Sequence, residues 1–254
     1  MAMNPESLRA QLKASHTPDQ IRRRLVHGQN HSYLRDFVYG AVDGAVTTFA
    51  VVSGVAGAGL APRIVIIMGM ANLFADGFSM AVSNFLGIRS EKQQLERAST
   101  QEQLHLKLYP EGEVEEIRQI FAGKGFTGDV LEQAVQIITS NKKQWTYTML
   151  QEEYDFPLYQ ASAWKAALAT FVAFLLMGLV PVFPFLWNYL TTVPFRDPFM
   201  WSSISTAGAF FAIGAIKSRF VDKPWYLSGL ETLLLGGAAA TLAYLVGDLL
   251  KGLG

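Results

Sequence analysis

Two carboxylates stand inside apolar segments that are long enough to cross a lipid bilayer. Asp43 lies in DFVYGAVDGAVTTFAVVSGVAGAGLA, and Asp76 lies in IVIIMGMANLFADGFSMAVSNFLG. An ionisable group at membrane depth is energetically expensive, so it usually faces a bundle interior, a water-filled path or a partner. Two such groups on neighbouring segments indicate a route for a cation. The simpler alternative is a pair of hydrogen bonds to Ser or Thr that only hold the helices together.

The composition indicates a membrane protein with one polar portion. Half of the 254 residues are hydrophobic, 17% are charged, and the mean hydropathy is +0.21. The absence of cysteine excludes disulfides and thiolate metal sites. The polar N-terminus lacks the apolar region of a cleaved signal peptide. A formal net charge of zero, with its only dense basic run at residues 22–24, does not favour nucleic acid as a partner.

Five segments have the character of spanning helices, since a helix needs roughly 20 apolar residues to cross a bilayer. They cover residues 36–60, 63–88, 160–187, 198–218 and 225–249. We expect Pro181 and Pro184 to kink or end the third of them. Residues 1–35 are expected to form an amphipathic N-terminal segment, with one or two helices lying at the membrane surface from residue 5 onward.

Residues 89–157 interrupt the apolar pattern between the second and third spans. They hold 12 acidic and 8 basic residues and no spanning stretch. Proline and glycine positions divide them into expected helices at 90–108, 112–123, 128–139 and 141–154. The predicted fold class is an all-α membrane protein: transmembrane helices 1 and 2 over 36–88, an inserted helical domain over 89–157, and helices 3 to 5 over 158–254.

The basic residues near the span ends predict the orientation, because cytoplasmic loops carry an excess of Lys and Arg. Arginines at 22–24, 35 and 89 and the basic loop at 217–223 mark one side of the membrane. We therefore expect the N-terminus and the acidic domain in the cytoplasm and the C-terminus outside.

Three polar residues and a methionine recur every four positions along the second span, at Asn72, Asp76, Met80 and Asn84. Residues at this spacing share a helix face, so they predict a polar stripe. Asp43 and Thr47 make a shorter stripe on the first span. A thioether beside carboxylates suits a transition metal better than Mg²⁺ or Ca²⁺, although a lone methionine is more often a packing residue.

The acidic domain carries three pairs of potential metal ligands at helical spacing. The pairs are Glu102 with His105, Glu113 with Glu116, and Met149 with Glu153. If the helices pack side by side, carboxylate, imidazole and thioether groups together suit Fe²⁺, Mn²⁺, Co²⁺ or Zn²⁺. The alternative is that these residues only form the solvated face of exposed helices.

These segments resemble a known family. The runs FVYGAVDGAVTTFAVVSGVAGAGL and ANLFADGFSMAVSNFLGIRSEK are similar to the first two helices of the vacuolar iron transporter family. YPEGEVEEIRQIFAGKGF and TMLQEEYDFP resemble that family's cytoplasmic domain. The resemblance covers roughly residues 30–250. It implies a homodimer of five-helix subunits that exports Fe²⁺ or Mn²⁺ from the cytosol in exchange for protons, with the ion path at the dimer interface.

The resemblance also implies roles for individual residues of this sequence. Asp43 and Met80 match the family's intramembrane ion path. The positions that match its cytoplasmic metal-binding site are Glu102, Glu113, Glu116, Met149 and Glu153.

This sequence departs from the family's pattern at four places. These differences bear on metal preference and proton coupling rather than on the fold. Asn72 replaces a Glu of the eukaryotic pattern, and Ser83-Asn84 replaces Gly-Glu. His105 stands where the family tends to have Glu, and Leu150 where a second Met is common. Asp76, one turn from Asn72, is a candidate to supply the missing charge.

The leading hypothesis is therefore a proton-coupled metal antiporter in the inner membrane of a bacterial cell, with protons, lipid and a second copy as partners. It is not an enzyme and has no prosthetic group; Fe²⁺ or Mn²⁺ is the transported ion, and Zn²⁺ or Co²⁺ can substitute. One alternative is a membrane-anchored ferroxidase or ferritin-like enzyme, because Glu102-x-x-His105 has the spacing of di-iron carboxylate proteins. Another is a metal sensor without transport, against which two intramembrane carboxylates argue.

Overall fold

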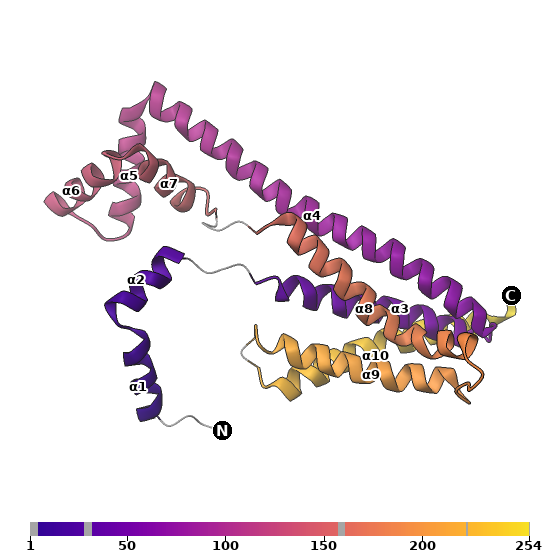
Figure 1. Ribbon diagram of the computed structural model, residues 1–254. Helices are drawn as coiled ribbons and strands as arrows, with labels where there is room; N and C mark the ends of the chain where they lie inside the picture. The colour runs from indigo at the N-terminus through magenta and orange to yellow at the C-terminus, as the bar shows by residue number, and fades with distance from the viewer. Residues whose placement is uncertain (1–4, 28–31, 157–160, 222, 254) are drawn as a thin grey trace. The chain divides into compact units, whose positions relative to one another are not determined.

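Helices make up all of the regular structure in the residues that the computed structural model describes, which are 5–27, 32–156, 161–221 and 223–253 (Figure 1). They are α1 Pro5–Ser15, α2 Pro18–His27, α3 Leu34–Gly57, α4 Pro62–Leu108, α5 Pro110–Gly123, α6 Gly128–Thr139, α7 Lys142–Glu152, α8 Ala163–Leu190, α9 Pro198–Lys217 and α10 Trp225–Leu249, followed by the 3₁₀ turn Lys251–Leu253.

Five of these helices are long and apolar enough to cross a membrane, namely α3, α4, α8, α9 and α10. This confirms the prediction of an all-α chain with five spanning helices. The chain divides into two compact units. The first holds residues 1–31 and 90–161, and the second holds residues 32–89 and 162–254. The predicted boundary at 157–158 lies outside the described residues.

Two predicted helix breaks are absent from the structure. The sequence predicts separate helices over 63–88 and 90–108, whereas α4 is continuous. No proline interrupts it between Pro62 and Pro110, and Gly87 alone lowers helix stability by only about 1 kcal/mol.

Pro181 and Pro184 do not end α8, which continues to Leu190. The Ser202 hydroxyl of α9 donates a 2.6 Å hydrogen bond to the Pro181 carbonyl. This bond ties α8 to α9. The carbonyls that lose a helical partner lie four residues before each proline, at Met177 and Val180, and membrane helices tolerate proline where neighbouring helices satisfy such groups.

Helix α3 is the central helix of the second unit, and small residues let its neighbours approach closely. A Cβ atom added at Gly40 or Gly44 would overlap the α8 backbone at Thr170 or Phe174. Gly57 meets the α10 backbone in the same manner. Membrane helices associate through such small-residue contacts, because lipid offers no hydrophobic driving force between them. This packing fixes the height and rotation of α3, and hence of its polar residues.

The first unit has a small core of its own. Ile117, Val135, Trp145 and Met149 are buried together where α5, α6 and α7 meet. Arg118 of α5 donates a 2.8 Å hydrogen bond to Glu132 of α6, which holds these two helices in register. The position of α5 against α7 in turn sets which acidic side chains face one another.

We predict that Gly44→Ala destabilises the protein by about 1–3 kcal/mol, the usual cost of overpacking a tight contact. The new methyl group meets the backbone at Phe174, which cannot rotate away. Thermal unfolding of the purified protein in detergent measures the effect. Gly208→Ala in α9 is the control, because a Cβ there meets nothing within 4 Å. Equal stability of the two variants would contradict the packing described for α3.

Candidate functional site

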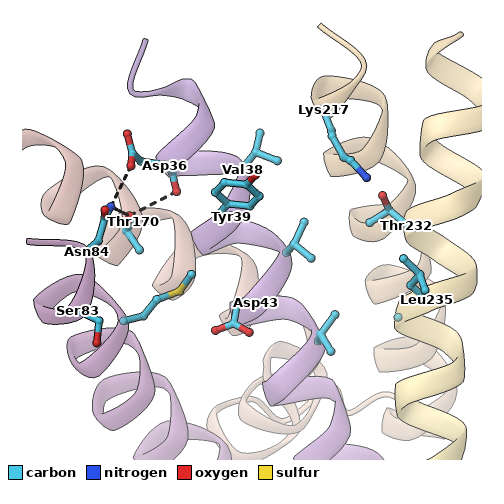
Figure 2. Close-up of a pocket in the computed structure, with 14 residues that line it drawn as sticks. Asp36, Val38, Tyr39, Asp43, Ser83, Asn84, Thr170, Lys217, Thr232 and Leu235 are labelled. Atoms are coloured by element: carbon cyan, nitrogen blue, oxygen red, sulfur yellow. Dashed lines mark hydrogen bonds between the residues drawn. The ribbon is translucent and has the colours of Figure 1, made fainter. Parts of the chain in front are cut away.

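A cavity of about 650 Å³ lies within the second unit, lined by residues of α3, α4, α8, α9 and α10 (Figure 2). Its polar lining includes Asp36 and Asp43 from α3 and Ser83 and Asn84 from α4. Met80 also lines it. Three residues predicted for the ion path, Asp43, Met80 and Asn84, therefore share one cavity.

The Asp43 carboxylate is only partly exposed, and no hydrogen bond or ion pair reaches it from the described residues. Its charged neighbour is Asp76, whose like charge repels it. A carboxylate in an apolar bundle without a partner is the arrangement expected where a cation or a proton binds. Met80 adds a soft sulfur ligand to the same cavity.

Asn84 joins three helices at one side of the cavity. Its side-chain nitrogen donates 2.9 Å hydrogen bonds to Asp36 Oδ1 and to Thr170 Oγ1. The Thr170 hydroxyl donates to the Asp36 carbonyl oxygen at 3.4 Å. Asn84 therefore orients Asp36 at the cavity wall (Figure 2).

The other predicted path residues lie outside the cavity. Asn72 Nδ2 donates to the hydroxyls of Thr47 and Thr48, at 3.3 and 3.4 Å. The Thr47 hydroxyl donates to the Asp43 carbonyl at 2.9 Å. For Asn72 and Thr47 the contacts are those of helix packing. Asp76 is exposed on α4 and does not line the cavity.

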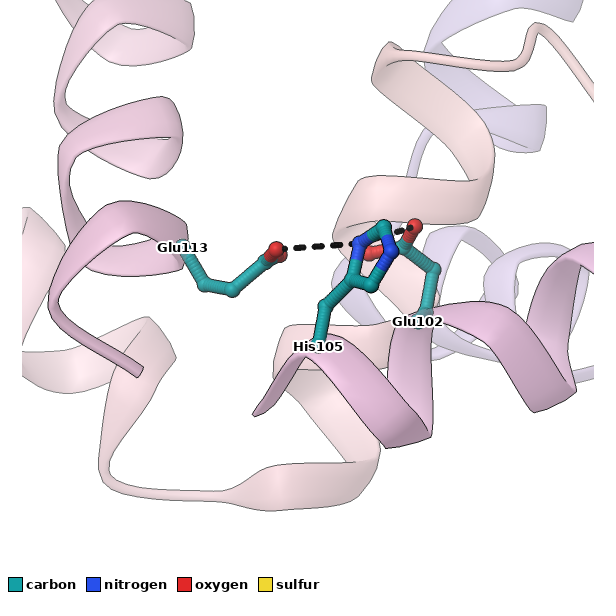
Figure 3. A group of neighbouring side chains, drawn as sticks. All are labelled: Glu102, His105 and Glu113. Atoms are coloured by element: carbon teal, nitrogen blue, oxygen red, sulfur yellow. Dashed lines mark ion pairs between the residues drawn. The ribbon is translucent and has the colours of Figure 1, made fainter. Parts of the chain in front are cut away.

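A second cluster lies in the first unit, where the end of α4 meets α5 (Figure 3). Glu102, His105 and Glu113 each offer one ligand atom, and these atoms all lie within 4.8 Å of one another. His105 Nδ1 is 3.3 Å from Glu113 Oε1 and 3.8 Å from Glu102 Oε1. Glu102 is 1% exposed and Glu113 is 5% exposed.

One oxygen of each glutamate is buried without a hydrogen-bond partner in the described residues, namely Glu102 Oε2 and Glu113 Oε2. An unpaired buried carboxylate oxygen is costly. Burial raises the pKa of Glu113 to about 7; repulsion from Glu102 and Glu116 adds to this effect, and His105 opposes it. A bound cation would supply the missing partner for both oxygens.

The remaining predicted ligands line a neighbouring pocket of about 340 Å³. Glu116 comes from α5, Met149 from α7, and Glu153 from the residue after α7. Burial, followed by repulsion from Glu102 and Glu116, raises the pKa of Glu153. The structure thus gathers three of the six predicted residues into one cluster and places the other three around an adjacent pocket.

Sequence spacing missed three residues that the structure adds. Tyr154 donates a 2.9 Å hydrogen bond to Glu102 Oε1, although it lies beyond the end of α7, where helical spacing carries no information. Thr170 and Lys217 reach the membrane cavity from α8 and α9. The only sequence signals for these two are a threonine within an apolar segment and a lysine at the end of another.

Comparison with known proteins connects both units to one family. The profile of the VIT family matches residues 34–248. The vacuolar iron transporter of Plasmodium berghei (strain Anka) is 30% identical over 235 residues, which cover 89% of this chain and 86% of that protein. The vacuolar iron transporter of Toxoplasma gondii is 30% identical over 253 residues, covering 94% and 83%. Vacuolar iron transporter 1 of Tulipa gesneriana is 28% identical over 234 residues, covering 90% and 93%.

The raised pKa of Glu113 predicts a pH-dependent stability of the metal-free protein. The folded state keeps this proton at pH values where an unfolded glutamate, with its ordinary pKa of 4.5, has lost it. The free energy of unfolding should therefore fall as the pH rises from about 4.5 through 7. The loss is at most about 3.5 kcal/mol, since one pKa unit corresponds to about 1.4 kcal/mol.

Thermal unfolding at several pH values, with a chelator present, measures this effect. In Glu113→Gln the free energy of unfolding should fall less steeply with rising pH, because the amide stays neutral at all these pH values. Glu111→Gln, an exposed position on the same helix, should follow the wild type. A fall that is equally steep in all three proteins would show that Glu113 is not its source.

Proposed function

This chain belongs to the VIT family, and from that membership we propose that it is a proton-coupled transporter that exports Fe²⁺ or Mn²⁺ from the cytosol. The relatives named above are transporters by name, and we assign this chain a transport function rather than an enzymatic one. The observation that carries the proposal is the Asp43 carboxylate beside Met80 in the membrane cavity, which no hydrogen bond or ion pair from the described residues reaches.

In this proposal the membrane cavity holds the ion in transit. Asp43 supplies charge, Met80 supplies a soft ligand, and the Asn84–Asp36 pair supplies a second, oriented carboxylate. Thioether and carboxylate ligands together favour Fe²⁺ or Mn²⁺ over Mg²⁺ and Ca²⁺. Zn²⁺ or Co²⁺ can occupy the same ligands.

The acidic unit collects the ion before transport. Glu102, His105 and Glu113 lie together, and two of their carboxylate oxygens have no hydrogen-bond partner among the described residues. Glu116, Met149 and Glu153 lie around the adjacent pocket. The basic residues at the span ends support a cytoplasmic place for this unit and for the N-terminus, in a bacterial inner membrane with the C-terminus outside.

Proton coupling follows from the chemistry of the ligands. Protons and metal ions compete for the same carboxylate lone pairs, so protonation weakens metal binding. A proton that reaches Asp43 from the outer side would release the metal there. Asp76 repels Asp43 when both are charged, so it favours the uptake of a cation or a proton by either group.

Asp76 also supports a homodimer. It is exposed on α4 between Phe74 and Phe78, which are 56% and 65% exposed. A carboxylate on a spanning helix is costly when it faces lipid. A second copy of the chain that covers this face would remove Asp76 from lipid and place it near the ion path at the dimer interface.

The test is metal flux into proteoliposomes with an internal pH indicator. We predict Mn²⁺ and Fe²⁺ uptake with matching proton exit, and at least a tenfold loss of rate in Asp43→Asn, because the neutral amide cannot balance the charge of the ion. Asp248→Asn is the control: it removes an exposed carboxylate of the same unit that does not line the cavity.

Two results would favour one of the alternative functions over transport. Metal binding without flux in the wild type would favour a sensor. Oxygen-dependent oxidation of Fe²⁺ that His105→Ala abolishes would favour the ferroxidase.

Tyr154 provides a test of the cluster formed by Glu102, His105 and Glu113, which we call the capture cluster. Its hydroxyl fixes one oxygen of Glu102, and loss of such an outer partner typically lowers metal affinity about 10–100-fold. We predict an affinity loss of this order for Tyr154→Phe, measured by Mn²⁺ titration of the purified protein. Tyr147→Phe, an exposed tyrosine of α7, is the control and should bind as the wild type does. Equal affinities for both variants would remove Tyr154 from the site.

A further inference from the structure

A lysine lines the same cavity as Asp43. Lys217 is the last residue of α9, and its side chain is 33% exposed. Figure 2 shows it on the side of the cavity away from the Asn84–Asp36 pair, near Thr232 of α10. At the sequence level Lys217 only marks the cytoplasmic end of a span. A positive charge on the wall of a cation site opposes binding, and it opposes a divalent ion twice as strongly as a monovalent one.

Glu231 of α10 compensates this charge from outside the cavity. Its Oε2 lies 3.9 Å from Lys217 Nζ and 3.2 Å from Lys223 Nζ. Glu231 and Lys223 are not among the residues that line the cavity. One carboxylate thus stands between a lysine that faces the ion site and a second lysine that does not.

We propose that Glu231 sets the affinity of the cavity for divalent cations by neutralising the ammonium group of Lys217. The inference rests on the proposed transport function, and it adds residues to which the sequence pattern assigns no role in transport. With the pair intact, the charge of Asp43 attracts a cation. Without Glu231, the ammonium on the wall cancels much of that attraction.

If the Lys217–Glu231 ion pair had only a structural role, the variants would behave differently. If the ion pair only fastens α9 to α10, then removing either partner loosens the same contact, and both variants change in the same direction. The electrostatic role requires opposite signs, because one variant adds net positive charge to the wall and the other removes it.

The experiment compares Mn²⁺ uptake by Glu231→Gln, Lys217→Gln and the double variant in proteoliposomes, with KM and kcat measured separately. Glu231→Gln should raise KM roughly three- to tenfold, and Lys217→Gln should lower it by a similar factor. This is the effect expected for one charge that acts on a divalent ion over roughly 6–12 Å at a dielectric constant near that of water, about 80; both side chains are partly exposed. The double variant should return KM close to the wild-type value.

Lys165→Gln is the matched control, since it removes one charge from an exposed residue of α8 that does not line the cavity. Its KM should not change. Shifts of KM in the same direction in the two single variants, or an unrestored double variant, would overturn the inference.

A measurement of Mn²⁺ affinity at equilibrium tests the role of Glu231 independently of whether the protein transports metal. In a background with Glu102, Glu113, Glu116 and Glu153 all changed to Gln, the predicted ligand carboxylates of the first unit are removed. Electron paramagnetic resonance of Mn²⁺ then reports binding to the cavity. The same opposite shifts are expected in Kd, whether or not the wild type moves metal. Absence of flux with these shifts would reject transport and keep the role of Glu231; equal Kd values in all variants would reject that role.

Discussion

Backbone contact between α3 and its neighbours is the constraint on which the membrane cavity depends. Gly40 and Gly44 let α3 lie against the α8 backbone, and Asp43 stands directly beside Gly44 in the sequence. A bulkier residue at either glycine would push α3 away from α8 and change where the carboxylate sits. The same contact brings Asp36 to Thr170 and Asn84, so the geometry of the polar groups follows from the packing of small residues.

The two compact units share a chemical arrangement, although one site lies in an apolar helix bundle and the other in an acidic helical domain. Each contains carboxylate oxygens that have no hydrogen-bond partner in the part of the chain that the structure describes. They belong to Asp43 in the second unit and to Glu102 and Glu113 in the first. Each places a methionine beside acidic groups, Met80 in the first case and Met149 in the second. Unsatisfied carboxylates with a soft ligand favour a transition metal, and their affinity for protons makes metal binding depend on pH.

The sequence predicts the five spans and the proximity of Glu102 to His105, because both depend on local patterns. Hydropathy and length are sufficient for the five spanning helices, and spacing along one helix brings Glu102 together with His105. The two predicted helix breaks that are absent have different causes. The break near residue 89 fails for a local reason, because no proline interrupts α4 between Pro62 and Pro110. The end predicted at Pro181 and Pro184 fails for a long-range reason, because α8 packs against α3 and α9, and no local pattern reports that packing. Tyr154 and Lys217 join their sites from loops or distant helices, which no periodicity reveals.

Locating the bound metal tests the account most directly. Anomalous diffraction at the manganese edge, from crystals of the protein soaked in Mn²⁺, would show each occupied site without reference to activity. The account predicts one peak among Glu102, His105 and Glu113 and another within ligand distance of Asp43 and Met80. Peaks confined to the acidic unit, with the cavity empty at saturating Mn²⁺, would contradict the claim that Asp43 carries the ion through the membrane.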